Sequence, residues 1–161
     1  MQEIEMFVGL KIPDTTAITT FHTLEKMGYE NIAKVSRENY YKFEIEGNED
    51  DFNKKIVKVD ILVNANKNNF TLLNKGEKIK DASDENVKQI NILVQNIDDD
   101  SAGIMYTLKQ RLGFNEIKKM EKGILWKIFI KDAGNKKNVN EAEEITNNLL
   151  INRHYQKYKI V

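Results

Sequence analysis

The sequence repeats itself, and this repetition constrains the fold more than any other feature, because two copies of a repeat adopt the same local structure. A segment beginning at Ile4, IEMFVGLKIPDTTAITTFHTLEKMGYENIAKV, aligns with a segment beginning at Ile90, INILVQNIDDDSAGIMYTLKQRLGFNEIKKM. Three identities fix the alignment of the first helix in each copy: Thr23 with Thr107, Leu24 with Leu108, and Gly28 with Gly113.

The repeat continues to the end of the chain. NYYKFEIEG aligns with ILWKIFIKD, and LVNANKNNF, from Leu62, aligns with LINRHYQKY, from Leu150. The last match pairs Asn64 with Asn152 and Phe70 with Tyr158. The offset between the copies changes by only a few residues, so loop-sized insertions and deletions explain it. We therefore predict a first copy over residues 1–75, a polar linker over 76–87 and a second copy over 88–161.

Each copy reads as strand, helix, strand, strand, helix, strand. Short apolar runs predict the first strands, at residues 6–8 and 92–94. Asp14 or Thr15 caps the helix that follows in the first copy, and Asp100 or Ser101 caps its equivalent. Apolar residues recur at three or four positions along both helices, which then end at Gly28 and Gly113, because glycine readily takes the left-handed backbone of a C-cap.

The second half of each copy begins with an alternating strand. Tyr41, Phe43 and Ile45 share one face, and Trp126, Ile128 and Ile130 repeat this pattern. The remaining expected elements are second helices over about residues 50–63 and 139–151, and closing strands over 70–73 and 155–161.

This order predicts an α+β fold, two tandem βαββαβ units with an antiparallel sheet and both helices on one side. The other sheet face is apolar where Phe7, Tyr40 and Phe129 are expected. Two copies that packed sheet to sheet would bury that face as a pseudo-dimer within one chain.

The composition excludes several classes of function. The chain has 25 basic and 25 acidic residues, so its formal charge is zero and no net field attracts nucleic acid or anionic membranes. It has no cysteine, which fits a reducing compartment and excludes thiolate chemistry. No segment is long and apolar enough to span a bilayer. We expect a cytoplasmic protein with no nucleic-acid or membrane partner.

Few residues are candidates for chemistry. His22 and His154 align with Tyr106 and Asn66 and not with histidines, which favours surface positions for both histidines over paired catalytic roles. The acidic runs at residues 48–51 and 98–100 each precede a helix, where carboxylates cap free amides, so this role is favoured over a cation site. Phosphate-binding and nucleophile motifs are missing. We expect no catalytic residue, cofactor or metal ion.

Three segments carry a family resemblance: MGYENI at residues 27–32, EKGIL at 121–125, and LLIN at 149–152 followed by Tyr158. They resemble PurS, the small subunit of phosphoribosylformylglycinamidine synthase in purine biosynthesis, and the likeness covers nearly the whole chain, once per copy. The resemblance implies a subunit with no active site of its own. PurS dimers dock the glutaminase subunit PurQ and the synthetase subunit PurL, so that ammonia passes between them, and self-association of this chain is compatible with that role.

The sequence departs from the family at the expected turns. The resemblance implies a central hairpin in each copy, at Gly123 and at Glu38-Asn39, which stands where PurS has glycine; asparagine tolerates the positive φ of such a turn. The Ala-Asn-Pro ending of the family keeps only its asparagine, at Asn64 and Asn152. We expect Asn64, Asn152 and Tyr158 to contribute to a partner interface, while a helix C-cap is the alternative role of the asparagines. The alternative function is a small-molecule sensor of paired α+β units, with its ligand held where the copies meet.

Overall fold

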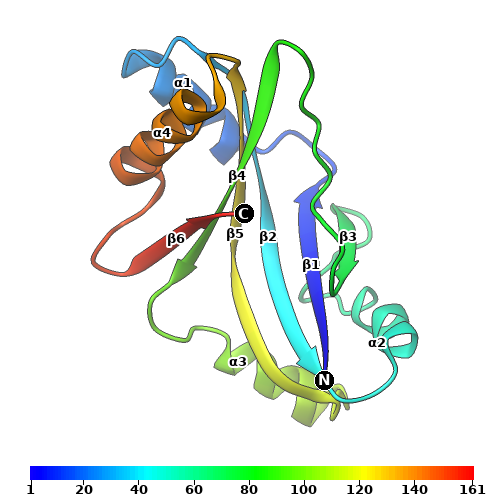
Figure 1. Ribbon diagram of the computed structural model, residues 1–161. Coiled ribbons are helices and arrows are strands. Elements are labelled where there is room, and N and C mark those ends of the chain that lie inside the picture. The colour runs from blue at the N-terminus through cyan, green and yellow to red at the C-terminus, as the bar shows by residue number, and fades with distance from the viewer. The chain divides into compact units, whose positions relative to one another are not determined.

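The computed structural model describes all residues from Met1 to Val161, and it is an α+β fold with one six-stranded antiparallel sheet and four helices (Figure 1). The strand order is β3-β1-β2-β5-β4-β6. In chain order the elements are β1 (Gln2–Leu10), α1 (Thr15–Lys26), β2 (Ile32–Ile45), α2 (Glu49–Ile56), β3 (Asn68–Asn74), β4 (Val87–Asn96), α3 (Ala102–Tyr106), η1 (Thr107–Arg111), β5 (Ile117–Lys131), α4 (Asn135–Ile145), η2 (Thr146–Leu150) and β6 (Gln156–Ile160). The segments η1 and η2 are π-helical turns that continue α3 and α4.

The predicted hairpins in the middle of each copy are absent, and this prediction was wrong. β2 and β5 run without a break through Glu38-Asn39 and through Gly123. Neither Asn39 nor Gly123 has a positive φ, so neither residue has the backbone that a tight hairpin requires. Asn39 instead pairs with Val8 of β1, which keeps it within the ladder. Each half of the chain is therefore strand, helix, long strand, helix, strand.

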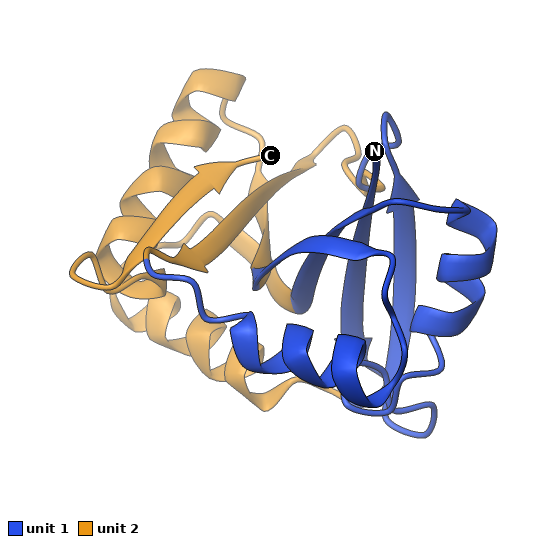
Figure 2. Ribbon diagram, turned by 90° about the horizontal axis from the view of Figure 1, so that it is seen from below, with its two compact units in different colours: residues 1–12, 38–79, 98–123 blue, residues 13–37, 80–97, 124–161 orange.

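Two compact units divide the chain, and Figure 2 colours them. Unit 1 consists of Met1–Ile12, Glu38–Ile79 and Asp98–Gly123, and unit 2 consists of Pro13–Arg37, Lys80–Ile97 and Ile124–Val161. The chain passes from one unit to the other within β2 and again within β5. The units therefore do not coincide with residues 1–75 and 88–161, although residues 75–86, near the predicted linker, contain no helix or strand.

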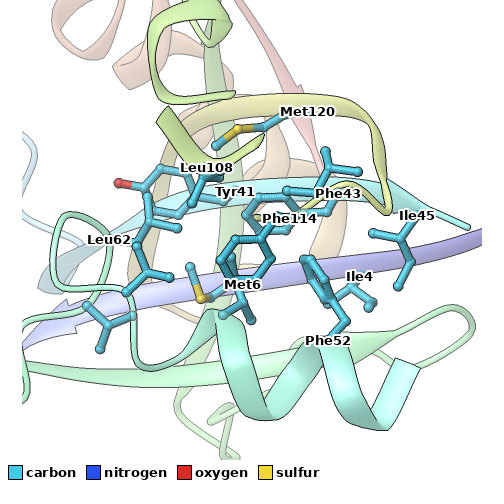
Figure 3. Close-up of a cluster of buried hydrophobic side chains, with 14 of the residues drawn as sticks. Ile4, Met6, Tyr41, Phe43, Ile45, Phe52, Leu62, Leu108, Phe114 and Met120 are labelled. Atoms are coloured by element: carbon cyan, nitrogen blue, oxygen red, sulfur yellow. The ribbon is translucent and has the colours of Figure 1, made fainter. Parts of the chain in front are cut away.

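The core of unit 1 forms on the helix-covered side of its strands (Figure 3). Ile4 and Met6 of β1 lie opposite Phe43 and Tyr41 of β2, and all four side chains are buried. Helix α2 adds Phe52, whose ring packs edge-on against Phe43 with centroids 5.3 Å apart. The second copy supplies four further members of this core, Leu108, Phe114, Ile117 and Met120.

Unit 2 has an equivalent core. Ile92 of β4 lies opposite Trp126 of β5, and Ile90 lies opposite Ile128. Helix α4 contributes Ala142 and Ile145, which are completely buried. The first copy supplies four further members of this core, Ala17, Leu24, Ile32 and Val35.

The copies therefore exchange their first helices. Leu24 and Leu108 are aligned in the repeat and both are completely buried, but Leu24 of the first copy packs in the unit that holds β4 and β6, and Leu108 of the second copy packs in the unit that holds β1 and β3. Fully burying one leucine side chain contributes about 2 kcal/mol. Each core thus depends on side chains from both copies.

The opposite face of the unit 1 strands is also buried at two of the predicted positions. Phe7 and Tyr40 are cross-strand partners with ring centroids 5.4 Å apart, and both lie outside the core described above. Burial raises the pKa of Tyr40, and its hydroxyl donates a hydrogen bond to Glu5 at 2.8 Å, which raises it further. In unit 2, Phe129 is only half-buried, and the Lys34 ammonium lies 5.6 Å from its ring centroid.

The helix caps confirm the sequence prediction at three points. Asp14 caps α1 by accepting hydrogen bonds from the amides of Thr16 and Ala17. Gly28 and Gly113 follow the first helix of each copy with φ of 94° and 78°, in the left-handed region that glycine tolerates. The bounds of the second helices differ from the predicted ones. Helix α2 ends at Ile56, earlier than expected, and α4 begins at Asn135, also earlier than expected.

A fragment experiment tests the exchange of helices. We expect residues 1–80 alone, and residues 81–161 alone, to show no cooperative thermal transition or to self-associate, because each fragment lacks the helix that completes its strands. Circular dichroism melting and analytical ultracentrifugation measure both properties. A monomeric fragment that melts as sharply as the whole chain, at a similar temperature, would show that its core is self-sufficient.

Candidate functional site

Asn64, a predicted interface residue, organises the turn before β3. Its side-chain Oδ1 accepts a hydrogen bond from the Asn66 amide at 3.0 Å, and its own amide donates to Asn68 Oδ1 at 2.9 Å. The Asn64 carbonyl accepts from the amides of Lys67 and Asn68. This arrangement is an Asx turn, which asparagine favours because its side chain mimics a backbone acceptor.

Asn152 makes the same turn before β6. Its Oδ1 accepts from the His154 amide at 3.0 Å, and its amide donates to Gln156 Oε1 at 3.0 Å. Its carbonyl accepts from the amides of Tyr155 and Gln156. The recurrence of asparagine is explained by this turn, a local role different from the helix C-cap that the sequence suggested. A contact of either asparagine with a partner stays a prediction.

Each turn accepts the same backbone hydrogen bond from the residue that follows the neighbouring strand, β1 or β4. The Lys11 amide donates to the Lys67 carbonyl at 2.9 Å, and the Ile97 amide donates to the Tyr155 carbonyl at 2.8 Å. In the repeat, Lys11 is equivalent to Ile97 and Lys67 is equivalent to Tyr155. The structure therefore reproduces the sequence alignment at the level of single hydrogen bonds.

Tyr158, the third predicted interface residue, lies in β6 opposite Val94 of β4. Its ring packs against the unit 2 core, and its hydroxyl accepts a hydrogen bond from Asn147 Nδ2 at 3.3 Å. Its equivalent in unit 1, Phe70, lies opposite Val8 and is exposed. The structure thus places Asn152 and Tyr158 in unit 2 and Asn64 in unit 1, and each unit has one of the two asparagine turns and one of the aligned aromatic residues Phe70 and Tyr158.

A pair of substitutions tests how much the Asn64 side chain stabilises its turn. We expect Asn64→Ala to lower the free energy of unfolding by about 1 kcal/mol, because the Asn66 amide loses its acceptor. Asn64→Asp keeps an acceptor oxygen and should remain close to the wild type. Urea unfolding measures the difference, and an Ala variant as stable as the wild type would mean that the turn does not need this side chain.

An ion pair joins the beginning of the first helix to the middle of the long strand, and it occurs in both copies. In unit 2, Arg37 Nε donates to Asp14 Oδ2 at 2.8 Å, and the Arg37 guanidinium lies 5.8 Å from the Trp126 ring centroid. In unit 1, Lys122 Nζ lies 3.6 Å from Asp100 Oδ2. Asp14 and Asp100 precede equivalent helices, so both copies have the same carboxylate–cation contact, with arginine in one copy and lysine in the other.

The environment of Asp14 favours its charged form. Burial raises the pKa of Asp14, but the hydrogen bond from Arg37, the amides of Ala17 and Thr16 and the positive charge of Arg37 together hold it below its ordinary value. Because the folded state lowers this pKa, the carboxylate stabilises the fold above the unfolded pKa, which is near 4. This contribution is lost as the pH falls through the lower, folded pKa.

Asp14→Asn tests this contribution, since asparagine still caps a helix but carries no charge. We expect the variant to unfold with roughly 1 kcal/mol less free energy at pH 7, and the difference from the wild type to begin shrinking near pH 4 and to disappear only below the lower, folded pKa. Chemical denaturation across this pH range measures it, with the exposed Asp60→Asn as control. A difference that is constant with pH would mean that the charge is not responsible.

The other sequence candidates lie on the surface. His22 is exposed on α1, with Nδ1 3.1 Å from Glu25 Oε1, and His154 is exposed in the turn before β6. Asn48 caps α2 by accepting from the Asp51 amide, and Asp99 accepts from Ser101. The structure contains no group of three or more histidine, cysteine, aspartate or glutamate side chains positioned to hold a metal ion.

Unit 1 has a surface hollow of about 450 Å³ that the sequence analysis did not predict. It lies where α2 and η1 end, and it is lined by Lys55, Lys58, Val59, Asp60, Ile61, Leu112 and Phe114. Phe114 packs edge-on against Phe52 of the core with ring centroids 5.8 Å apart, and the Lys55 ammonium lies 5.0 Å from the Phe114 centroid. Lys55 Nζ also donates to Glu116 Oε1 at 2.7 Å. The lining residues come from two segments far apart in the chain, which is why no motif indicated them.

Comparison with models of known protein families finds no match to this sequence, and comparison with curated proteins also finds none. None of the helices combines the length and the apolar character that crossing a lipid bilayer requires.

Proposed function

We propose that this chain is a non-catalytic assembly subunit of a PurS-like kind, which docks a glutaminase and a synthetase for ammonia transfer in phosphoribosylformylglycinamidine synthesis. The observation that carries the proposal is the reciprocal exchange of α1 and the α3–η1 helix between the two units. Each core contains equivalent elements from both copies, as expected for a dimer of repeats fused into one polypeptide.

Three repeated details support the same reading. Both copies have an Asx turn before their last strand, a backbone bond from that turn to the first strand, and an ion pair at the start of their first helix. A fused pair presents two related surfaces whose sequences diverge independently at exposed positions. Such a chain is suited to hold two different partners, whereas a symmetric dimer offers the same surface twice.

The physical benefit of an assembly subunit lies in the transfer step. Ammonia released at a glutaminase site reaches a separate synthetase site efficiently only when the two active sites are held together, because a docked arrangement raises its effective concentration. Ammonia supplied in solution bypasses this requirement. The subunit therefore acts on glutamine-dependent turnover and has little effect on ammonia-dependent turnover.

Reconstitution tests the proposal. We expect this chain alone to have neither glutaminase nor ATPase activity, and to raise glutamine-dependent product formation when added to the PurL and PurQ proteins of its own organism. Turnover with ammonium chloride is the matched control and should change much less. If glutamine-dependent turnover is the same with and without the chain, the assembly role is wrong.

A further inference from the structure

We propose that the hollow at the helix ends of unit 1 docks an acidic segment of a partner protein through one bulky apolar side chain. This inference rests on the assembly role proposed above and names the chemistry of the partner.

The first observation is apolar exposure. Ile61 and Leu112 flank the hollow with 57% and 49% of their surface exposed, while Val59 and Phe114 are buried beneath them. An apolar side chain placed there would contact a preformed apolar floor.

The second observation is the charge of the surrounding helix ends. The last turn of α2 carries Lys54 and Lys55, and the last turn of η1 carries Lys109 and Arg111. Lys58 adds a fifth cation at the hollow itself. Lys55 is paired with Glu116 and Asp60 lines the rim, so the local balance remains positive in a chain whose formal net charge is zero.

Helix capping does not account for these cations. Basic residues near a helix C-terminus interact favourably with its free carbonyls. In unit 2, the equivalent end of α1 carries only one basic residue, Lys26, and the equivalent end of η2 carries none. Equivalent helices therefore end with far fewer cations, and the excess in unit 1 is available to carboxylates of a partner.

The equivalent position in unit 2 has different chemistry. Tyr29 follows Gly28 as Phe114 follows Gly113, and its hydroxyl donates to Glu144 Oε1 at 2.8 Å and accepts from Asn148 Nδ2 at 3.2 Å. Glu141 and Glu143 add negative charge near Glu144, whereas Lys136 and Lys137 lie at the opposite, N-terminal end of this helix. Met27, the equivalent of Leu112, is similarly exposed at 45%, so the two positions differ in charge more than in apolar exposure. An acidic segment is attracted to unit 1 and repelled from unit 2.

A defined peptide tests the proposal with the full chain. The probe is a fluorescein-labelled peptide of about 16 residues, the length of four helical turns, with one central leucine and mainly glutamate elsewhere. We expect saturable binding by fluorescence anisotropy, about tenfold weaker with Leu112→Asp or with Lys58→Glu. Met27→Asp is the matched control and should bind like the wild type. A peptide with lysine in place of glutamate should not bind.

Circular dichroism melting verifies that each variant is folded, and all three substituted side chains are exposed in the structure. Absence of saturable binding by the wild type would overturn the proposal. So would binding that is unaffected by both unit 1 substitutions, or equally weakened by Met27→Asp. The assay contains no synthase subunit, so its failure is distinguishable from failure of the reconstitution, which reports only on the purine pathway role.

Discussion

The structure depends on the burial of each copy's first helix against strands of the other copy. Leu24 and Leu108 are aligned in sequence and completely buried, yet each lies in the unit built around the opposite copy's first and last strands. Helices of this length have little stability by themselves in water, so α1 depends on this packing to form. The long strands β2 and β5 make the exchange possible, because each carries the chain from one unit into the other without a turn.

The turns and ion pairs of the two copies are more alike than their exposed surfaces are. The Asx turns of Asn64 and Asn152 form the same set of hydrogen bonds, because the geometry of a tight turn accepts few residue types. The ion pairs at the helix starts keep the carboxylate and change the cation from Arg37 to Lys122. Neither constraint applies to the exposed helix ends, where unit 1 carries several cations and unit 2 only Lys26. A role in bringing different partners together requires this combination of a shared frame and unlike surfaces.

The sequence predicted the features that short-range chemistry determines. The cap at Asp14, the left-handed glycines 28 and 113, and the alternating faces of Phe43 and Ile128 all follow from local rules. The predicted hairpins failed because Asn39 and Gly123 are typical of turns, whereas tertiary pairing keeps both in extended strands. The helix exchange was also missed, since an apolar stripe indicates that a helix is buried but not against which strands. The hollow in unit 1 joins segments about fifty residues apart and has no sequence signature.

The π-helical turn η1 shows how such a chain tolerates change in length. Between the aligned threonine and glycine, the second copy has one residue more than the first, and the turn from Thr107 to Arg111 absorbs it, with the Leu112 amide bonded to the Thr107 carbonyl. Because a wider turn accommodates the insertion inside the helix, Leu108 keeps its buried position and Gly113 keeps its left-handed backbone. A single-codon insertion can therefore reshape the surface beyond the bulge while the interior contacts stay in register. A chain with two similar halves can thus make their surfaces unlike without rebuilding either core.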